Sequence, residues 1–226
     1  MINAVKKNVY ALIVLATISI GVMAESIDVK VIGTINPAAC KVALTSGGTI
    51  DYGIININTL NKDKFTILSE KQIDFSISCD APAKVALKTI NGRPGSLAGN
   101  HEKVSGYGRA PVKINSDFAA GLGVDAGKKV GGYGLSFSDA TADNVKTENI
   151  YRHGEWNQGE WDFNKSRGIF SNVESLFSWG GKDSPIAFTV LTGKLNVQAY
   201  INKASELDLT KPVKLDGLTT LELVYL

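Results

Sequence analysis

The chain contains two cysteines, Cys40 and Cys79, and their pairing is the first chemistry that the sequence offers. Both follow a segment that reads as an export signal, and an even cysteine count in an oxidising compartment favours a disulfide. Free or metal-binding thiols are the alternative, but neither cysteine stands in a C-x-x-C pair, and His101 and His153 lie far from both in the sequence. We therefore predict a Cys40–Cys79 disulfide that closes a loop of roughly forty residues and restricts the unfolded chain by about 4 kcal/mol.

Several residues match parts of catalytic motifs, but none of the patterns is complete. Glu155 and Glu160 suit the carboxylate pair of a glycosidase, yet they stand in a polar Gly/Asn/Gln-rich stretch, where a solvated acidic edge is the favoured interpretation. Residues 121–126 fit a G-x-G-x-x-A string, but no helix is indicated after it, so a hairpin turn is favoured. No serine stands in a G-x-S-x-G elbow, and two histidines leave few candidates for a general base. The sequence predicts no enzyme, no catalytic residue, no cofactor and no metal site.

The first 24 residues predict a cleaved signal peptide. Lys6 and Lys7 form a basic start, an apolar run follows over residues 9–22, and Val22 and Ala24 place small residues at the −3 and −1 positions of a cleavage site. The run is short for a membrane span and no second run follows, so an uncleaved N-terminal anchor is the less favoured alternative.

Removal of residues 1–24 changes the charge balance. Two of the 24 basic residues and none of the acidic residues are lost, which leaves 22 basic against 22 acidic residues. No Lys/Arg run offers a surface that could follow a phosphate backbone, so a nucleic-acid partner is not expected. The remaining chain of about 200 residues is long enough to bury a core, either as one large β domain or as two small ones.

Apolar residues alternate with polar ones in several segments, and this period of two predicts an all-β fold. The pattern is present in residues 27–31, in residues 73–79, which include Cys79, and in residues 213–225. The last segment predicts a long C-terminal strand. No segment has a sustained apolar stripe with a period of 3.6 residues.

Turn residues divide the rest of the chain. Thr192-Gly193-Lys194 predicts a hairpin turn between two strands. Residues 173–179 allow one or two helical turns. Residues 92–181 are richer in glycine and contain no Ser/Pro linker, so they predict hairpins and long loops on the same domain.

Three features together resemble the pilins of chaperone–usher fimbriae. Residues 33–40, with the sequence Gly-Thr-Ile-Asn-Pro-Ala-Ala-Cys, resemble the first-strand signature of that family. A second cysteine, Cys79, follows at the family's spacing, and the chain closes with an alternating strand whose penultimate residue is Tyr225. The glycine-rich central region is similar to that of a less-characterised group of fimbrial proteins.

The resemblance implies an incomplete immunoglobulin-like (pilin) β-sandwich with long central hairpins and loops, which lacks its final strand. It divides the chain into a signal peptide (1–24), an N-terminal donor-strand extension (25–32) and a pilin-type domain (33–226). The donor strand would bury Ile27, Val29 and Val31 in a neighbouring subunit. Leu221, Leu223 and Tyr225, on the C-terminal strand, would line the acceptor groove and contact the chaperone before assembly.

The function that the resemblance implies is that of a structural subunit which polymerises by donor-strand exchange into a fimbrium for surface adhesion. The implied partners are a periplasmic chaperone, an outer-membrane usher and neighbouring subunits, in a homo- or hetero-polymer, and the implied location is the cell surface. The alternative is a tip or minor adhesin in which Tyr151, Trp156 and Trp161 bind a host or surface glycan. A periplasmic hydrolase that uses an acid such as Glu160 is a third, weaker possibility.

Overall fold

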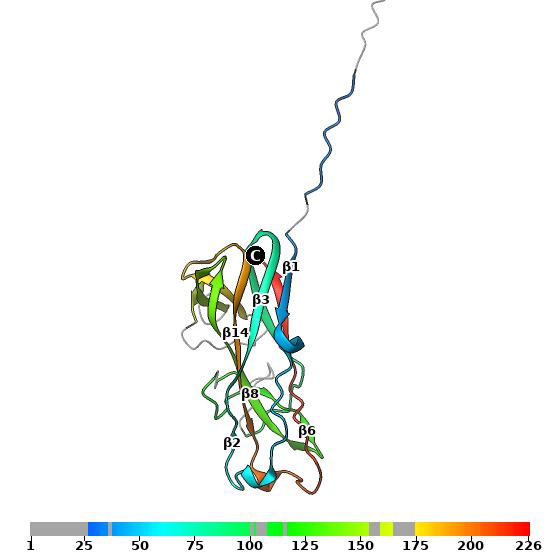
Figure 1. The fold of residues 1–226 in the computed structure, drawn as a ribbon, viewed down its shortest axis with the longest axis vertical. Helices are drawn as coiled ribbons and strands as arrows, with labels where there is room; N and C mark the ends of the chain where they lie inside the picture. The colour runs from blue at the N-terminus through cyan, green and yellow to red at the C-terminus, as the bar shows by residue number, and fades with distance from the viewer. Residues whose placement is uncertain are drawn as a thin grey trace, which may run out of the picture. The chain divides into compact units, whose positions relative to one another are not determined.

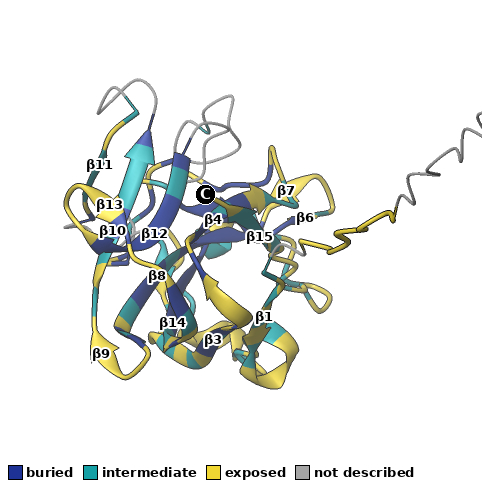
Figure 2. Cartoon of the chain, turned by 90° about the horizontal axis from the view of Figure 1, so that it is seen from above, coloured by how far each residue is buried: buried dark blue, intermediate teal, exposed yellow. Residues whose placement is uncertain are grey.

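The computed structural model describes residues 27–35, 38–99, 102, 108–114, 117–153, 159–164 and 175–226. The chain divides into two units, residues 1–36 and residues 37–226, and each is described by itself. In the first unit, residues 27–35 have no regular secondary structure and are exposed (yellow in Figure 2). The expected signal peptide, residues 1–24, lies outside the described residues.

The described elements of the second unit are strands and three short 3-10 helices. In chain order they are β1 (Cys40–Leu44), η1 (Thr45–Gly48), η2 (Ile57–Thr59), β2 (Thr66–Ile67), β3 (Lys71–Ala83), β4 (Val85–Asn91), β5 (Ala120–Gly121), β6 (Val124–Asp125), β7 (Lys128–Lys129), β8 (Gly131–Ala142), β9 (Val145–Lys146), β10 (Glu148–His153), β11 (Trp161–Phe163), β12 (Ser175–Gly181), β13 (Ser184–Pro185), β14 (Phe188–Ile201), η3 (Ala204–Glu206) and β15 (Thr219–Tyr225). Among the described residues, no helix combines the length and the hydropathy that crossing a bilayer would take.

The strands form two antiparallel sheets and a small hairpin. The first sheet has the order β1-β3-β14-β8-β5, and Figure 1 shows β1, β3, β14 and β8 side by side. The second sheet has the order β11-β10-β12-β4-β15, and β6 pairs with β7 in the hairpin. The predicted all-β class is confirmed, and the architecture is a β-sandwich. Within the described strands, β1 ends one sheet and β15 ends the other.

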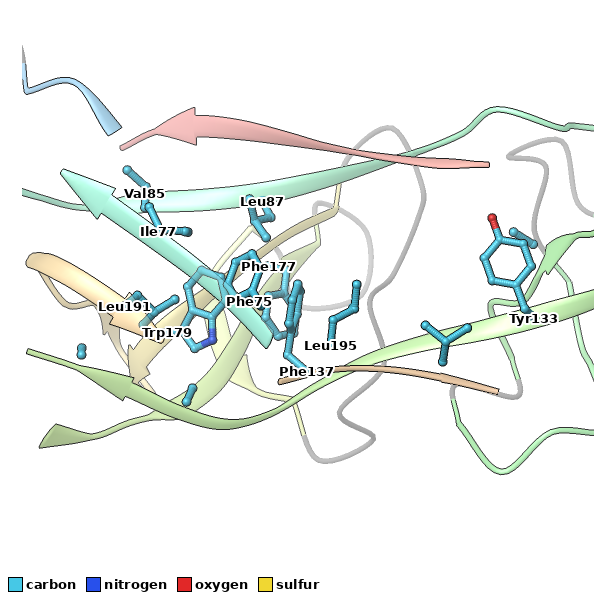
Figure 3. Close-up of a cluster of buried hydrophobic side chains, with 14 of the residues drawn as sticks. Phe75, Ile77, Val85, Leu87, Tyr133, Phe137, Phe177, Trp179, Leu191 and Leu195 are labelled. Atoms are coloured by element: carbon cyan, nitrogen blue, oxygen red, sulfur yellow. The ribbon is translucent and has the colours of Figure 1, made fainter. Parts of the chain in front are cut away.

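Aromatic side chains from both sheets meet in the core between them (Figure 3). Phe75 and Phe137 come from the first sheet, and their ring centroids lie 4.6 Å apart. Trp179 comes from the second sheet and lies 5.6 Å from each of these rings. Because aromatic side chains bury large apolar areas and prefer tilted or edge contacts, this cluster is a main source of the attraction between the sheets.

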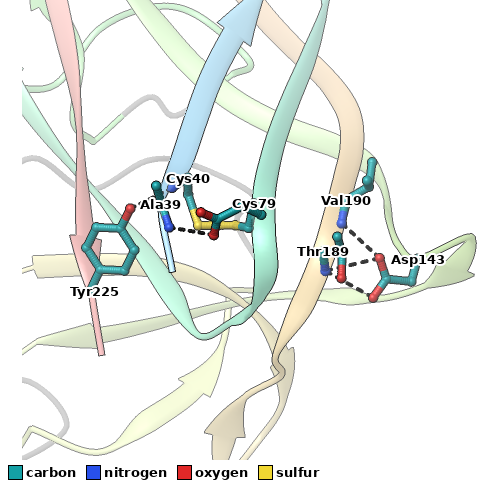
Figure 4. Close-up of a disulfide and its surroundings, with 8 residues drawn as sticks. Ala39, Cys40, Cys79, Asp143, Thr189, Val190 and Tyr225 are labelled. Carbon is teal, nitrogen blue, oxygen red and sulfur yellow. Dashed lines mark hydrogen bonds between the residues drawn. A yellow bond between two sulfur atoms is a disulfide. The ribbon is translucent and has the colours of Figure 1, made fainter. Parts of the chain in front are cut away.

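The predicted disulfide between Cys40 and Cys79 is confirmed (Figure 4). The two cysteines are directly opposite each other in the antiparallel pairing of β1 with β3. The bond therefore links the first residue of β1 to β3. The backbone N–H of Ala39 donates to Asp80 Oδ1 at 2.7 Å on the same side.

Two local predictions are wrong. Thr192-Gly193-Lys194 does not turn, because β14 continues through it as one strand that pairs with both β3 and β8. The glycine instead stands at a bulge in the pairing with β8, where a Cβ atom would lie 3.0 Å from the carbonyl oxygen of Ser138. The described part of residues 173–179 is strand β12 rather than a helical turn, because its side chains complete the aromatic core.

Part of the glycine-rich central region forms a second apolar layer rather than a free loop. Tyr200 points away from the main core, and its hydroxyl donates to the carbonyl of Ala98 at 2.6 Å. Leu97 and Val112 pack around its ring in a small buried cluster. Gly134 of β8 lies under this layer, since a Cβ atom there would be 1.8 Å from the carbonyl oxygen of Ile114. The glycines thus allow the second apolar layer to lie close against the sheet.

Candidate strand-binding groove

An open apolar groove of about 850 Å³ runs along one side of the second unit. Its floor is the inner face of two neighbouring strands of the first sheet, and it consists of Tyr133, Leu135, Leu195, Val197, Ala199 and Ile201. Residues 49–57, the first wall, line one side. Residues 207–218, the second wall, line the other.

The first wall has the side-chain pattern of a strand without the pairing of one. Ile50, Tyr52 and Ile55 are half-buried against the main core, and Asp51 and Ile54 are exposed. Within the described part of the chain, no backbone–backbone hydrogen bond involves residues 50–55. Buried or half-buried backbone groups that lack partners are costly, so this wall offers a free edge to another strand. The sequence analysis did not identify this wall.

The second wall also has half-buried apolar side chains and lacks backbone pairing. Leu207, Leu209, Val213 and Leu215 are half-buried and line the groove. Among the described residues, no backbone–backbone hydrogen bond involves residues 208–215. The sequence predicted a strand from Val213 onward, but regular strand begins only at Thr219, where β15 pairs with β4. An alternating segment cannot form a ladder where no neighbouring strand is present.

Three contacts hold the C-terminal end of the second wall in place. Arg93 forms a bidentate ion pair with Asp216, with both N–O distances 2.8 Å. The N–H of Asp216 donates to the carbonyl of Leu122 at 3.0 Å, and the N–H of Gly92 donates to the carbonyl of Leu218 at 2.8 Å. The hydrogen bond from the guanidinium lowers the pKa of the Asp216 carboxyl, so the pair persists to lower pH than an isolated aspartate would allow.

Tyr52 attaches the first wall to the floor of the groove. Its hydroxyl donates to the carbonyl of Val197 at 3.3 Å and accepts the N–H of Ala199 at 3.2 Å. Lys71 adds a bond from its ammonium group to the carbonyl of Asp51 at 2.6 Å. Burial raises the pKa of the Tyr52 hydroxyl, and this outweighs the opposite effect of the Ala199 bond. The wall is therefore held by side chains, and among the described residues no backbone–backbone hydrogen bond involves residues 50–55.

Tyr52→Phe is expected to loosen the first wall without unfolding the domain. The N–H of Ala199 loses its acceptor, and a neutral hydrogen bond contributes about 0.5–1.5 kcal/mol, so its hydrogen exchange should quicken roughly two- to tenfold. Amide exchange followed by NMR measures this, with the amide of Leu191 in the same strand as the internal reference. Unchanged exchange at Ala199 would contradict the anchoring role of Tyr52.

The three predicted residues of the C-terminal strand have different environments. Leu221 lines the groove. Leu223 packs against the main core, opposite Leu87 of β4. Tyr225 lies beyond the groove, where its hydroxyl accepts the N–H of Cys40 at 2.7 Å (Figure 4).

The predicted donor residues lie in the first unit. The side chains of Ile27, Val29 and Val31 are 90%, 85% and 94% exposed. Ile32 and Ile35 in the same segment are equally exposed, and the sequence analysis did not include them. A row of exposed aliphatic side chains is unfavourable in water.

The predicted glycan-binding residues are not brought together. Tyr151 is opposite Asp162 in the pairing of β10 with β11, and Trp161 is opposite Arg152. Because neighbouring residues of a strand point to opposite faces, Tyr151 and Trp161 lie on different faces of this hairpin. The Arg152 guanidinium lies 5.2 Å from the centre of the Trp161 ring. Trp156 lies outside the described residues.

The fold and the groove define a class: an all-β sandwich with an open, apolar cleft between two unpaired segments. The chain belongs to the family described as "Protein of unknown function (DUF1120)", whose model matches residues 29–147, more than half of the chain. The matched segment includes β1, β3, β4, β8 and the disulfide. The family's description gives no activity.

Two proteins of Escherichia coli (strain K12) are similar to this chain. Protein GltF is 26% identical over 263 aligned positions, which cover 98% of this chain and 99% of GltF. The uncharacterized protein YhcF is 32% identical over 72 residues, which cover 32% of this chain and 29% of YhcF. The similarity to GltF therefore extends over nearly the whole chain.

Proposed function

We propose that this protein is a structural subunit of a chaperone–usher fimbrium, which polymerises by donor-strand exchange for surface adhesion. The observation that carries the proposal is the apolar groove whose two walls present half-buried apolar side chains and, among the described residues, form no backbone–backbone hydrogen bonds over 50–55 and 208–215. One added strand would supply hydrogen-bond partners to both walls and cover the apolar floor. Its backbone would pair with the walls, and its alternate side chains would cover the floor. Strand addition of this kind is a recurring mode of recognition, and pilin complementation is an established example of it.

Residues 27–35 have the chemistry of that added strand. Fully extended, they reach roughly 30 Å, and Ile27, Val29 and Val31 all point to one side of a strand. Burial of three aliphatic side chains, each worth about 1.5–3 kcal/mol, would yield a gross gain of about 5–9 kcal/mol. The segment belongs to one subunit and the groove to the next. Such a head-to-tail contact does not close on itself, so it builds a fibre.

The same geometry explains the need for the other proposed partners. A subunit with an empty groove exposes apolar side chains and a free edge at β15, which favours aggregation. A periplasmic chaperone would cover the groove until the usher at the outer membrane replaces it with the next subunit's segment. The adhesin alternative has less support, because Tyr151 and Trp161 do not form a common surface.

Periplasmic expression with and without the cognate chaperone tests the proposal. Without the chaperone, the subunit should aggregate or be degraded. With it, a soluble complex should form, and a chain that lacks residues 25–32 should still form this complex but no polymer. A stable monomer that gains nothing from the chaperone, with or without residues 25–32, would contradict the proposed function.

A further inference from the structure

The second wall of the groove is held at its two ends and not in between. At its N-terminal end, the N–H of Leu207 donates to the carbonyl of Ala204 at 3.3 Å, in the turn that η3 makes. At its C-terminal end, the N–H of Asp216 donates to the carbonyl of Leu122 at 3.0 Å. Within the described part of the chain, residues 208–215 form no backbone–backbone hydrogen bond between these points. The position of the wall therefore depends on how firmly its ends are fixed.

At the C-terminal end, a side chain takes over where backbone pairing stops. The N–H of Gly92 donates to the carbonyl of Leu218 at 2.8 Å, which extends the pairing of β4 with β15 by one bond. In the described structure, no backbone–backbone bond joins residues 93–96 to the second wall. Instead, Nε and Nη2 of Arg93 each donate to one carboxylate oxygen of Asp216, both at 2.8 Å.

The turn that carries Arg93 is itself fixed by hydrogen bonds. Its N–H donates to Asn91 Oδ1 at 2.8 Å, and its Nη1 donates to the carbonyl of Gly92 at 3.0 Å. Its carbonyl accepts the hydroxyl of Ser96 at 2.6 Å. A bidentate pair between a guanidinium and a carboxylate fixes orientation as well as distance. Arg93 therefore holds Asp216, and with it the end of the second wall, in one place.

The wall needs this support because both it and the floor of the groove are apolar. Leu209 and Leu215 line the groove from the wall, and Leu135 lines it from the floor. Apolar surfaces attract each other in water. A wall that was released at one end would gain by moving onto the floor, and the space for an incoming strand would narrow.

We propose that Arg93 is a positioning residue that keeps the acceptor groove open, because through Asp216 it holds the second wall where an incoming strand requires it. This inference rests on the proposed function. A wall that is already in place does not have to be ordered during binding, so loss of the ion pair should weaken binding. The two side chains are 34% and 60% exposed, and exposed ion pairs contribute little to stability. The fold should therefore persist without the pair.

Binding of a peptide tests the role of Arg93. The parent chain carries Val29→Asp and Val31→Asp, so that subunits do not fill one another's grooves, and fluorescence anisotropy measures its Kd for a fluorescein-labelled peptide of residues 25–36. Arg93→Met in this parent should raise the Kd at least about fivefold, because the wall must then be ordered on binding. Asp216→Asn, which keeps the shape of the side chain and loses its charge, should raise it about two- to fivefold.

Two further measurements separate positioning from a loss of stability. The urea midpoint, followed by circular dichroism, should stay close to that of the parent in both variants. Exchange of the Gly92 and Asp216 amides, followed by NMR, should quicken in Arg93→Met, since both amides bond at the end of the second wall. Exchange of the Leu191 amide should not change.

Arg109→Met is the matched control. It removes the guanidinium of another Arg–Asp ion pair, with Asp117 at 2.9 Å, and neither residue lines the groove. Its Kd should equal that of the parent. Arg93→Asp combined with Asp216→Arg exchanges the charges and should restore most of the affinity.

The outcomes distinguish the positioning role from the proposed function. Peptide binding by the parent with an unchanged Kd in Arg93→Met and Asp216→Asn would overturn the positioning role and leave the proposed function intact. An equal loss of affinity in Arg109→Met, or no recovery on charge exchange, would also overturn it, since the effect would then not depend on the pair with Asp216. A parent chain that binds no peptide would contradict both the positioning role and the proposed function.

Discussion

Val29→Asp combined with Val31→Asp is expected to abolish polymer formation and leave the domain folded. Both side chains lie in the segment outside the second unit, so neither contributes to its core. In the groove, each valine would contribute about 1.5–3 kcal/mol, and loss of both corresponds to at least about a hundredfold weaker joint. Burial of two unpaired carboxylates would weaken it further. Size-exclusion chromatography of the refolded variant measures the loss of polymer.

The matched control changes the alternate positions of the same segment. Asp28→Asn combined with Lys30→Gln alters two residues that would point away from the groove floor, so polymerisation should persist. Equal loss of polymer in both double variants would show that the segment does not act through two buried valines, and the proposed side-chain assignment would be wrong.

Leu215→Asp is expected to destroy the acceptor function while the donor function survives. Leu215 lines the groove from the second wall and packs against the edge of the main core. A carboxylate at this position would face the apolar floor without a partner, and the incoming strand would have to bury it. The variant alone should form no polymer, an effect of at least about a hundredfold if the penalty is about 3 kcal/mol.

Mixing the donor-deficient and acceptor-deficient chains tests the same prediction through the formation of a product rather than through its loss. The Leu215→Asp chain still carries an intact segment, and the Val29→Asp, Val31→Asp chain still carries an intact groove. The mixture should therefore yield heterodimers, and no species larger than a dimer should form. Lys146→Asp, at an exposed position outside the groove lining, is the control and should polymerise normally. Long polymers from the mixture, or no dimer at all, would contradict the division into donor and acceptor.

The sequence was most informative where local pattern and covalent chemistry determine structure. The cysteine count predicted the bond between Cys40 and Cys79, and the alternation of residues 73–79 predicted a strand with Phe75 and Ile77 in the core. These predictions need no knowledge of distant partners. A disulfide in an oxidising compartment and a half-buried strand are both readable from residue types and a period of two.

Long-range pairing was harder to predict. A glycine between two apolar runs suggests a turn, but Gly193 permits a bulge in a strand whose neighbours are distant in sequence. The first wall was missed because Gly53 interrupts its alternation: with φ +66, it shifts the pattern so that Ile55 rather than Ile54 faces inward. The environment of Tyr225 depended on β1 and β15 meeting, and nothing local to either segment specifies this.

Hydrogen exchange at the two walls is the most direct test of the central claim that the domain lacks one strand. The Val29→Asp, Val31→Asp chain is examined alone and with a synthetic peptide of residues 25–36, and exchange of the backbone amides in residues 50–55 and 209–215 is followed by NMR. Apart from Gly53 and Thr210, whose N–H groups donate to Asp51 and Asp208 side chains, the account predicts rapid exchange in the chain alone, since these amides have no backbone partner. It predicts strong protection of both walls once the peptide is bound. Amides that are already protected without peptide, or walls that stay unprotected with it, would contradict the account.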